Sequence, residues 1–223
     1  MIAAPTSGVV PAIVRLRITL RDVKPTVWRR FEVSLTATLA DLHAAIQAAM
    51  GWEDVHLHCF RILGQRYDPE YGLSEDVYLA DLRLRAGERF SYVYNHSASW
   101  EHELRVEAIG PGRPGRLYPR CIAGQQICPP EWCAGPEAYD EIKAELFGLS
   151  YDEDLQLVAE FGRAVLAARN STVGDVLDAV DVDQLQHALR RYERREELIG
   201  PFDRQRTNAA LGRLASNAEM WPA

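Results

Sequence analysis

Alternation of apolar and polar residues near the start of the chain is the strongest constraint on its fold. Ile13–Leu20 (IVRLRITL) repeats with a period of two, which places one set of side chains on a single face of a strand. After a short turn that contains Lys24 and Pro25, Val27–Leu35 (VWRRFEVSL) is typical of a second strand. Because only a few residues separate the two segments, we expect an antiparallel hairpin with one buried face.

A helix is predicted next, over Leu39–Met50. Apolar residues recur there at helical spacing. Thr38 and Asp41 resemble a capping box, with Asp in place of the usual Glu. Gly51 stands where such a helix should end.

Strand patterns then return over residues 56–63, 89–94 and 101–109. The order of two strands, one helix and three strands predicts an α+β fold, in which a helix packs on one face of a mainly antiparallel sheet.

Helical patterns dominate the remainder of the chain, over residues 137–146, 150–168 and 183–198. We therefore expect an α+β core over residues 13–139. A helical C-terminal extension over residues 140–223 should pack on that core.

Composition places the chain among globular proteins and excludes several classes. None of its 223 residues belongs to a run of about 20 apolar side chains, the length that a membrane helix needs. The first eleven residues have no basic segment, so we expect no signal peptide and a cytoplasmic location. The formal net charge of −7 argues against a surface that binds nucleic acid everywhere. Arginines concentrate in residues 15–30 and 190–206, which leaves a local protein or nucleic-acid partner open.

Three of the four cysteines, Cys121, Cys128 and Cys133, fall within a segment rich in Pro and Gly. Without an export signal they should be reduced thiols. Three thiolates and one imidazole satisfy tetrahedral zinc, and His102 is the fourth ligand that we consider first. The spacing lacks the paired C-x-x-C knuckles of zinc fingers. The alternative is that these residues are small buried thiols that pack the loop.

Histidines and aromatic residues suggest two further sites. On a strand, His56 and His58 would project to the same side, as ligands of one metal or as hydrogen-bonding groups beside a pocket. Aromatic residues could line a pocket for a small ligand, although such residues more often form a core. The members of this aromatic set are Trp28, Trp52, Tyr92, Tyr94 and Trp100.

Familiar catalytic signatures do not occur in the sequence. It has no G-x-x-x-x-G-K-[ST] loop, no dinucleotide-binding glycine pattern and no G-x-S-x-G elbow. His102 with Glu101 or Glu103 could serve acid–base chemistry, but a strand with alternating buried residues explains the same pattern. Both an enzyme and a non-enzymatic protein therefore stay open.

Several short motifs follow one another in a specific order: VWRR at 27–30, LADLH at 39–43, MGW at 50–52, HLHCF at 56–60, WEH at 100–102 and CPPE at 128–131. Over about residues 13–139 this ordered set resembles the plasmid pRiA4b ORF-3-like family. The resemblance implies a protein carried by plasmids and mobile elements, with an uncharacterised biochemical activity. It implies no recombinase chemistry.

Two segments depart from the pattern of that family. Residues 94–98 read YNHSA where members usually read YDFGD, and Trp132 stands where members have an acidic residue before Cys133. These changes weaken any carboxylate-based role inherited from the family. We rank a non-enzymatic binding or accessory module first. A zinc protein or metal-dependent enzyme built on the cysteine loop with His102 is second, and a small-ligand sensor is third.

Overall fold

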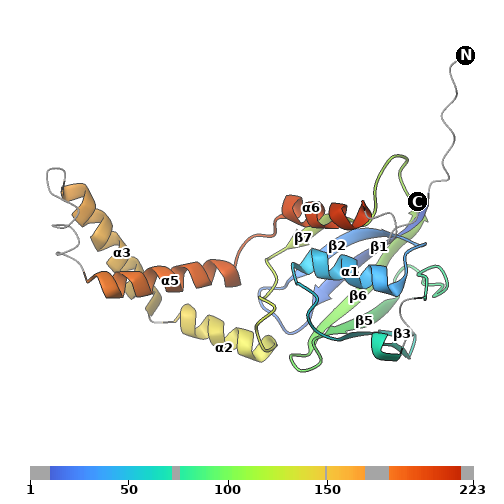
Figure 1. The fold of residues 1–223 in the computed structure, drawn as a ribbon, viewed down its shortest axis with the longest axis horizontal. Helices are drawn as coiled ribbons and strands as arrows, with labels where there is room; N and C mark the ends of the chain where they lie inside the picture. The colour runs from blue at the N-terminus through green and yellow to red at the C-terminus, as the bar shows by residue number, and fades with distance from the viewer. Residues whose placement is uncertain (1–10, 72–75, 149, 169–180, 217–223) are drawn as a thin grey trace, which may run out of the picture. The chain divides into compact units, whose positions relative to one another are not determined.

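The structure is a computed structural model that describes residues 11–71, 76–148, 150–168 and 181–216. It has the predicted α+β class, with an antiparallel sheet and helices (Figure 1). Two compact units are present: the first runs to Pro136 and resumes at Pro201, and the second is Glu137–Gly200. The last helix thus belongs with the sheet. The division of the sequence at residues 139 and 140 into folding domains stays a prediction.

The sheet has the spatial order β4-β3-β5-β6-β1-β2-β7, and all neighbouring strands are antiparallel. Its strands are β1 (Ala12–Leu20), β2 (Trp28–Ser34), β3 (His58–Ile62), β4 (Gln65–Tyr67), β5 (Arg89–Tyr94), β6 (Trp100–Pro111) and β7 (Arg120–Gln125). The alternation in the sequence predicts β1, β2, β3, β5 and β6. It misses β4, which has three residues, and β7, which interrupts its pattern with Gly124.

The described helices are α1 (Leu39–Met50), α2 (Pro136–Leu146), α3 (Ser150–Ala167), α5 (Val182–Leu198) and α6 (Arg204–Ala215), with a short 3-10 helix at Pro69–Tyr71. The sequence predicts four of these five α-helices. It misses α6, whose sequence RQRTNAALGRLA has a weak apolar repeat. None of the described helices combines the length and apolar character needed to cross a membrane.

Helix α1 begins and ends as its sequence predicts. The Asp41 amide donates to Thr38 Oγ1 at 3.1 Å, and the Thr38 amide donates to Asp41 Oδ2 at 2.8 Å, which completes the capping box. Gly51 ends the helix with a left-handed φ of 84°, a conformation that favours glycine. Leu39, Leu42 and Ile46 are fully buried against the sheet.

Helix α6 lies beside α1 in the sheet unit and packs on β7 (Figure 1). Asn208 fixes this contact, because its side chain accepts from the Cys121 amide and donates to the Cys121 carbonyl, both at 2.9 Å. Arg29 of β2 ties the same elements together from inside. Its Nε donates to the Ala49 carbonyl at 3.0 Å, and its guanidinium lies 4.3 Å from the ring of Phe202.

A buried carboxylate joins the helices of the second unit. Asp154 of α3 accepts from Arg191 and Arg195 of α5, with closest distances of 2.5 and 2.7 Å. The hydrogen bonds from Arg191, and then those from Arg195, hold the pKa of the Asp154 carboxyl below its usual value. The carboxylate form is therefore favoured by folding.

Substitution Asp154→Asn should lower the stability of this unit by about 2–3 kcal/mol, because it leaves buried Arg195 without a counter-charge. Asp152→Asn, at an exposed carboxylate of the same helix, should have little effect. Since folding lowers the pKa of Asp154, its contribution is present above the usual Asp pKa of about 3.9 and disappears as the pH falls below it. Hydrogen exchange of α3 and α5 peptides across this pH range measures both effects. Equal exchange in the two variants would contradict the role of Asp154.

Candidate metal centre

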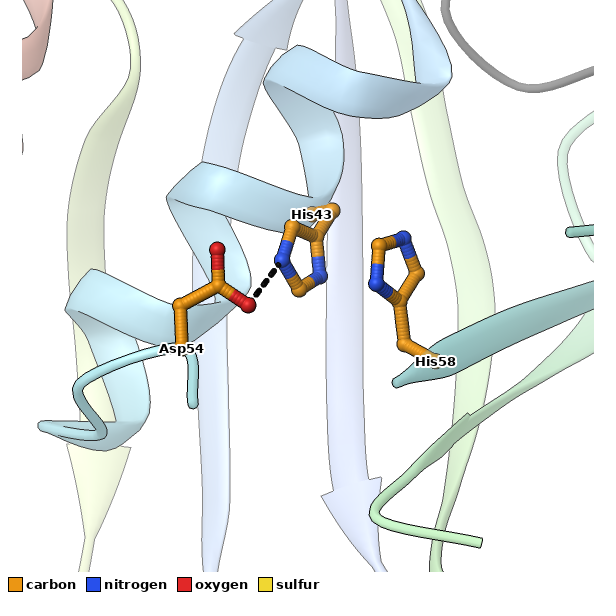
Figure 2. A group of neighbouring side chains, drawn as sticks. All are labelled: His43, Asp54 and His58. Carbon is orange, nitrogen blue, oxygen red and sulfur yellow. Dashed lines mark hydrogen bonds and ion pairs between the residues drawn. The ribbon is translucent and has the colours of Figure 1, made fainter. Parts of the chain in front are cut away.

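Three potential metal ligands converge from separate segments of the sheet unit. His43 comes from α1, Asp54 from the loop after that helix, and His58 from the first position of β3 (Figure 2). One ligand atom of each residue lies within 4.8 Å of the other two. Over the described residues, no other set of three His, Cys, Asp or Glu side chains meets in this way.

A hydrogen-bond chain runs through His43. Gln47 Nε2 donates to the Tyr92 hydroxyl at 2.8 Å, and Tyr92 Oη lies 2.8 Å from His43 Nδ1. His43 Nε2 lies 2.8 Å from Asp54 Oδ1, as the dashed line in Figure 2 marks. Because the carboxylate only accepts, the network places the His43 proton on Nε2, and Tyr92 then donates to Nδ1. Every bond in the chain thereby has one donor and one acceptor.

The second imidazole packs directly on the first. The rings of His43 and His58 are stacked, with centroids 3.5 Å apart and planes that differ by 5°. Burial lowers the pKa of His43 to about 4. Burial, followed by the proximity of His43, lowers the pKa of His58 to about 3. Both rings are thus neutral near pH 7, which is the form that binds metals.

His58 also carries a buried polar atom without a partner. Its side chain is about nine-tenths buried, and its Nε2 has no hydrogen-bond partner in the described structure. A buried polar atom that is left unpaired is unfavourable, so native proteins rarely leave one unsatisfied. A metal ion or another bound group would satisfy this nitrogen.

Metal binding requires the imidazoles to leave their present arrangement, because two parallel stacked rings cannot both direct an in-plane lone pair at one ion. Bonds of about 2.05 Å in a tetrahedron place neighbouring ligand atoms roughly 3.3 Å apart. The pair of His43 Nε2 and Asp54 Oδ1, now at 2.8 Å, would open slightly. The two rings would tilt out of their parallel stack so that their lone pairs converge on one point. Asp54 can follow such a shift because its side chain is half exposed.

Glu131 positions the loop that carries Asp54. Its carboxylate accepts from the Glu53 amide at 2.6 Å and from the Val55 amide at 3.4 Å. It therefore binds the backbone on both sides of Asp54. The Tyr94 hydroxyl donates to the same carboxylate. Asp54 itself has a φ of 60°. The motif CPPE at 128–131 therefore supports the site from a distant part of the chain.

Burial and the neighbouring Glu131 affect the acid groups of this loop. Burial, followed by Glu131, raises the pKa of the Asp54 carboxyl, while His58 opposes the shift. Burial, followed by the hydrogen bond to Glu131, raises the pKa of Tyr94, so this hydroxyl stays protonated and remains a donor. The loop is thus held by the Glu131 carboxylate, which accepts from two backbone amides of the loop and from the neutral Tyr94 hydroxyl.

The cysteines expected to bind zinc lie apart from this site. All three are buried, and burial raises the pKa of each thiol, that of Cys128 to about 12. Cys121 lies on strand β7, and Cys133 Sγ lies 3.8 Å from the Gly135 carbonyl. In the described residues the three thiols and His102 do not form a convergent ligand group. Zinc bound by these four residues stays a prediction.

His102 and four of the five aromatic residues gather in the core beside the centre, where the ring of Tyr92 lies 5.3 Å from that of His102. Trp52 stacks on Tyr94 with ring centroids 5.1 Å apart, and it lies 6.0 Å from Trp100 and 5.4 Å from His102. The buried nitrogens Trp100 Nε1 and His102 Nε2 have no hydrogen-bond partner among the described residues. Trp28 is separate, because it faces the opposite side of the sheet. A ligand pocket in this region stays a prediction.

His56 does not share a strand with His58. Strand β3 begins at His58, and His56 is exposed in the preceding loop, with its ring 5.8 Å from that of Tyr94. The expected same-side pair is therefore replaced by the stack of His58 on His43. The sequence does contain a signal for His43, since this imidazole lies on the apolar face of the predicted helix. Asp54 gives no comparable signal, because only the tertiary fold brings it to His43.

Substitution Glu131→Gln should weaken the hydrogen bonds that the side chain accepts from the Glu53 and Val55 amides. One carboxylate oxygen is replaced by an amide nitrogen, which cannot accept from a backbone amide. We expect a loss of about 1 kcal/mol in unfolding free energy and faster amide exchange at Glu53 and Val55. Glu53→Gln, which removes the same charge from an exposed side chain of this loop, should leave both unchanged. Urea unfolding and hydrogen exchange provide the measurements. Unaltered exchange in Glu131→Gln would show that the loop does not depend on this carboxylate.

Comparisons with known proteins identify a family and two relatives without an assigned function. A family model described as "Plasmid pRiA4b ORF-3-like protein" matches residues 12–162. The "Uncharacterized protein y4hQ" of Sinorhizobium fredii is 29% identical over 184 residues, which are 77% of this chain and 92% of that protein. The crystal structure of MM3350, a protein of unknown function from Methanosarcina mazei Go1, matches with a TM-score of 0.57 and 31% identity, over 64% of this chain and 87% of that one. Since the family model covers well over half of its length, the chain belongs to the plasmid pRiA4b ORF-3-like family.

Proposed function

We propose that this protein binds one divalent transition-metal ion through His43, Asp54 and His58. The observation that carries the proposal is the convergence of their ligand atoms within 4.8 Å. The unpartnered nitrogen of buried His58 supports it independently. Two neutral imidazoles and one carboxylate can bind a metal ion at neutral pH without losing a proton to solvent. The one change needed is that the His43 proton moves from Nε2 to Nδ1.

The donor set selects among metals. Imidazole nitrogen suits zinc, iron, nickel and copper, whereas magnesium and calcium prefer oxygen ligands. Zinc held by two histidines and one carboxylate is a ligand set of catalytic sites, which keep a position for water or substrate. The same set also suits Fe(II). We therefore place zinc first and iron second.

The hydrogen-bond chain around His43 can adapt to a metal. When Nε2 binds the ion, the proton moves to Nδ1, which then donates to the Tyr92 hydroxyl. Tyr92 must in turn find an acceptor for its own proton. Rotation of the Gln47 amide provides one, because Gln47 Oε1 has no partner in the described structure.

Three protein ligands leave the ion open to one further oxygen ligand. An ion in such a site polarises a bound oxygen and lowers the pKa of bound water. Asp54 links the site to solvent, since its side chain is half exposed while both imidazoles are buried. The binding or accessory role on mobile elements, expected from the family resemblance, stays a prediction that is compatible with a metal ion.

Metal content provides the direct test. Protein purified without a metal-affinity tag and analysed by elemental mass spectrometry should contain close to one transition-metal ion per chain. Asp54→Asn should reduce metal affinity at least tenfold, because an amide is a poor metal ligand. Asn suits this position because it tolerates the left-handed backbone better than most residues. Titration calorimetry with zinc measures the change.

His56→Ala is the matched control, since it removes an exposed imidazole two residues from His58. This variant should bind metal like the unmodified protein. Cys128→Ser and Cys133→Ser should also retain the ion. Loss of metal in the cysteine variants with retention in Asp54→Asn would refute the proposal and favour the cysteine loop. Absence of metal binding in the unmodified protein would refute both.

Tyr92→Phe tests the support of His43. This change removes the acceptor for the Nδ1 proton and should weaken metal binding about 10–100-fold, as the loss of a supporting hydrogen bond to a metal ligand typically does. Zinc titration with a competing chelator measures the affinity. The variant Tyr67→Phe, which removes a hydroxyl that donates to exposed Gln65 on strand β4, serves as the control. Equal affinities for both variants would contradict this role of Tyr92.

A further inference from the structure

Four arginines from four adjacent strands form a row on the face of the sheet opposite α1. Strand register pairs Arg89 of β5 with Arg105 of β6, Arg105 with Arg17 of β1, and Arg17 with Arg30 of β2. Directly opposed residues lie on the same face of a sheet. With neighbouring strands about 4.8 Å apart, the row spans about 14 Å.

Like charges opposite one another are unfavourable in a sheet, so this row requires an explanation. The two ends have counter-charges. Arg30 binds Glu107 with two bonds of 2.5 and 2.7 Å, and Arg89 lies 3.3 Å from Glu103. Arg17 and Arg105, at the centre, form no ion pair with any described carboxylate. The centre of the row therefore carries uncompensated positive charge.

Trp28 orients two neighbouring arginines of the row, Arg17 at the centre and Arg30 at one end. Its indole nitrogen donates to Gln125 Oε1 at 3.0 Å, which fixes the ring on the surface. The Arg17 guanidinium lies 4.5 Å from the ring centroid, and that of Arg30 lies 5.6 Å from it. These cation–π contacts hold the two guanidinium groups in place without neutralising their charge. A nucleic-acid base can stack on a guanidinium plane held in this way.

We propose that this row binds the backbone of a single-stranded nucleic acid. Arg17 and Arg105 contact phosphates at the centre, and Arg89 and Arg30 extend the contact on either side. An exposed sheet face with planar groups on its surface is a recurrent platform for single strands, whose bases are free to stack. The proposal does not depend on the metal ion, because His43, Tyr92 and His58 lie on the other face of the sheet.

The net charge of the whole chain limits the expected affinity for nucleic acid. With a formal net charge of −7, attraction is confined to the row, and affinity should be moderate and sensitive to salt. Two to four phosphate contacts predict a slope of roughly −1.5 to −3 for the logarithm of the binding constant against that of the salt concentration.

Fluorescence anisotropy with labelled oligo(dT) and oligo(U) of about 15 nucleotides, at about 50 mM salt, tests the proposal. We expect saturable binding by the full chain and at least a tenfold loss of affinity in Arg105→Glu. The variant should keep or increase its melting temperature, because a carboxylate between Arg17 and Arg89 removes repulsion. Arg163→Glu, with the same charge change at an exposed position of α3, should alter affinity less than twofold.

Three results would overturn the proposal. One is the absence of binding at low salt, which would make the row a purely structural feature. Another is equal affinity of Arg105→Glu and the unmodified protein. The third is stronger binding to duplex DNA or to phosphatidylserine vesicles than to either single strand, since the row would then recognise a different polyanion.

Discussion

Burial of one face of α1 against the sheet determines where the candidate site lies. The helical repeat that buries Leu39, Leu42 and Ile46 also turns His43 inward. An imidazole in that position loses its hydration and requires hydrogen-bond partners. Tyr92 and Asp54 supply them. The core packing of the helix thus creates a site in which a neutral imidazole, fixed at both nitrogens, faces a second imidazole.

The loop after α1 depends on residues from far along the chain. Trp52 donates from Nε1 to the Pro129 carbonyl at 2.9 Å, and Glu131 holds the amides on both sides of Asp54. The segment at 128–131 therefore holds the loop in place through these hydrogen bonds. Its motif, which belongs to the set that resembles the family, acquires a physical reason: the Glu131 carboxylate accepts from the Glu53 and Val55 amides, which follow α1 in irregular backbone and have no strand partner.

Local signals in the sequence predict the local structure of this region well. Thr38, Asp41 and Gly51 specify both ends of α1, because caps depend on residues within one turn of the helix end. The candidate site is different. His58 belongs to the predicted H-x-H pair, yet its true neighbour is His43, which lies in another element. Strand β3 begins two residues later than its pattern suggests, so the period-two argument does not apply to His56.

The cysteine segment shows the same limit. Proline and glycine near Cys128 and Cys133 correctly indicate irregular backbone, but Cys121 belongs to an edge strand whose pairing with β2 requires the whole sheet. A ligand set proposed from spacing alone cannot include this constraint. Burial of all three thiols is in keeping with packing, which was the alternative to zinc at the outset.

Strand β6 links the two faces on which the proposals rest. Its residues alternate between the core, with Trp100, His102 and Leu104, and the charged face, with Glu103 and Arg105. A slip of one residue in its register would exchange these sets, placing charges against α1 and aromatic side chains in water. The same hydrophobic pattern that secures the sheet therefore keeps the imidazole-rich core and the arginine row on opposite sides. A substitution on one face changes one proposed site and leaves the side chains of the other in place, so the metal site and the nucleic-acid surface can be separated experimentally within a single folded chain.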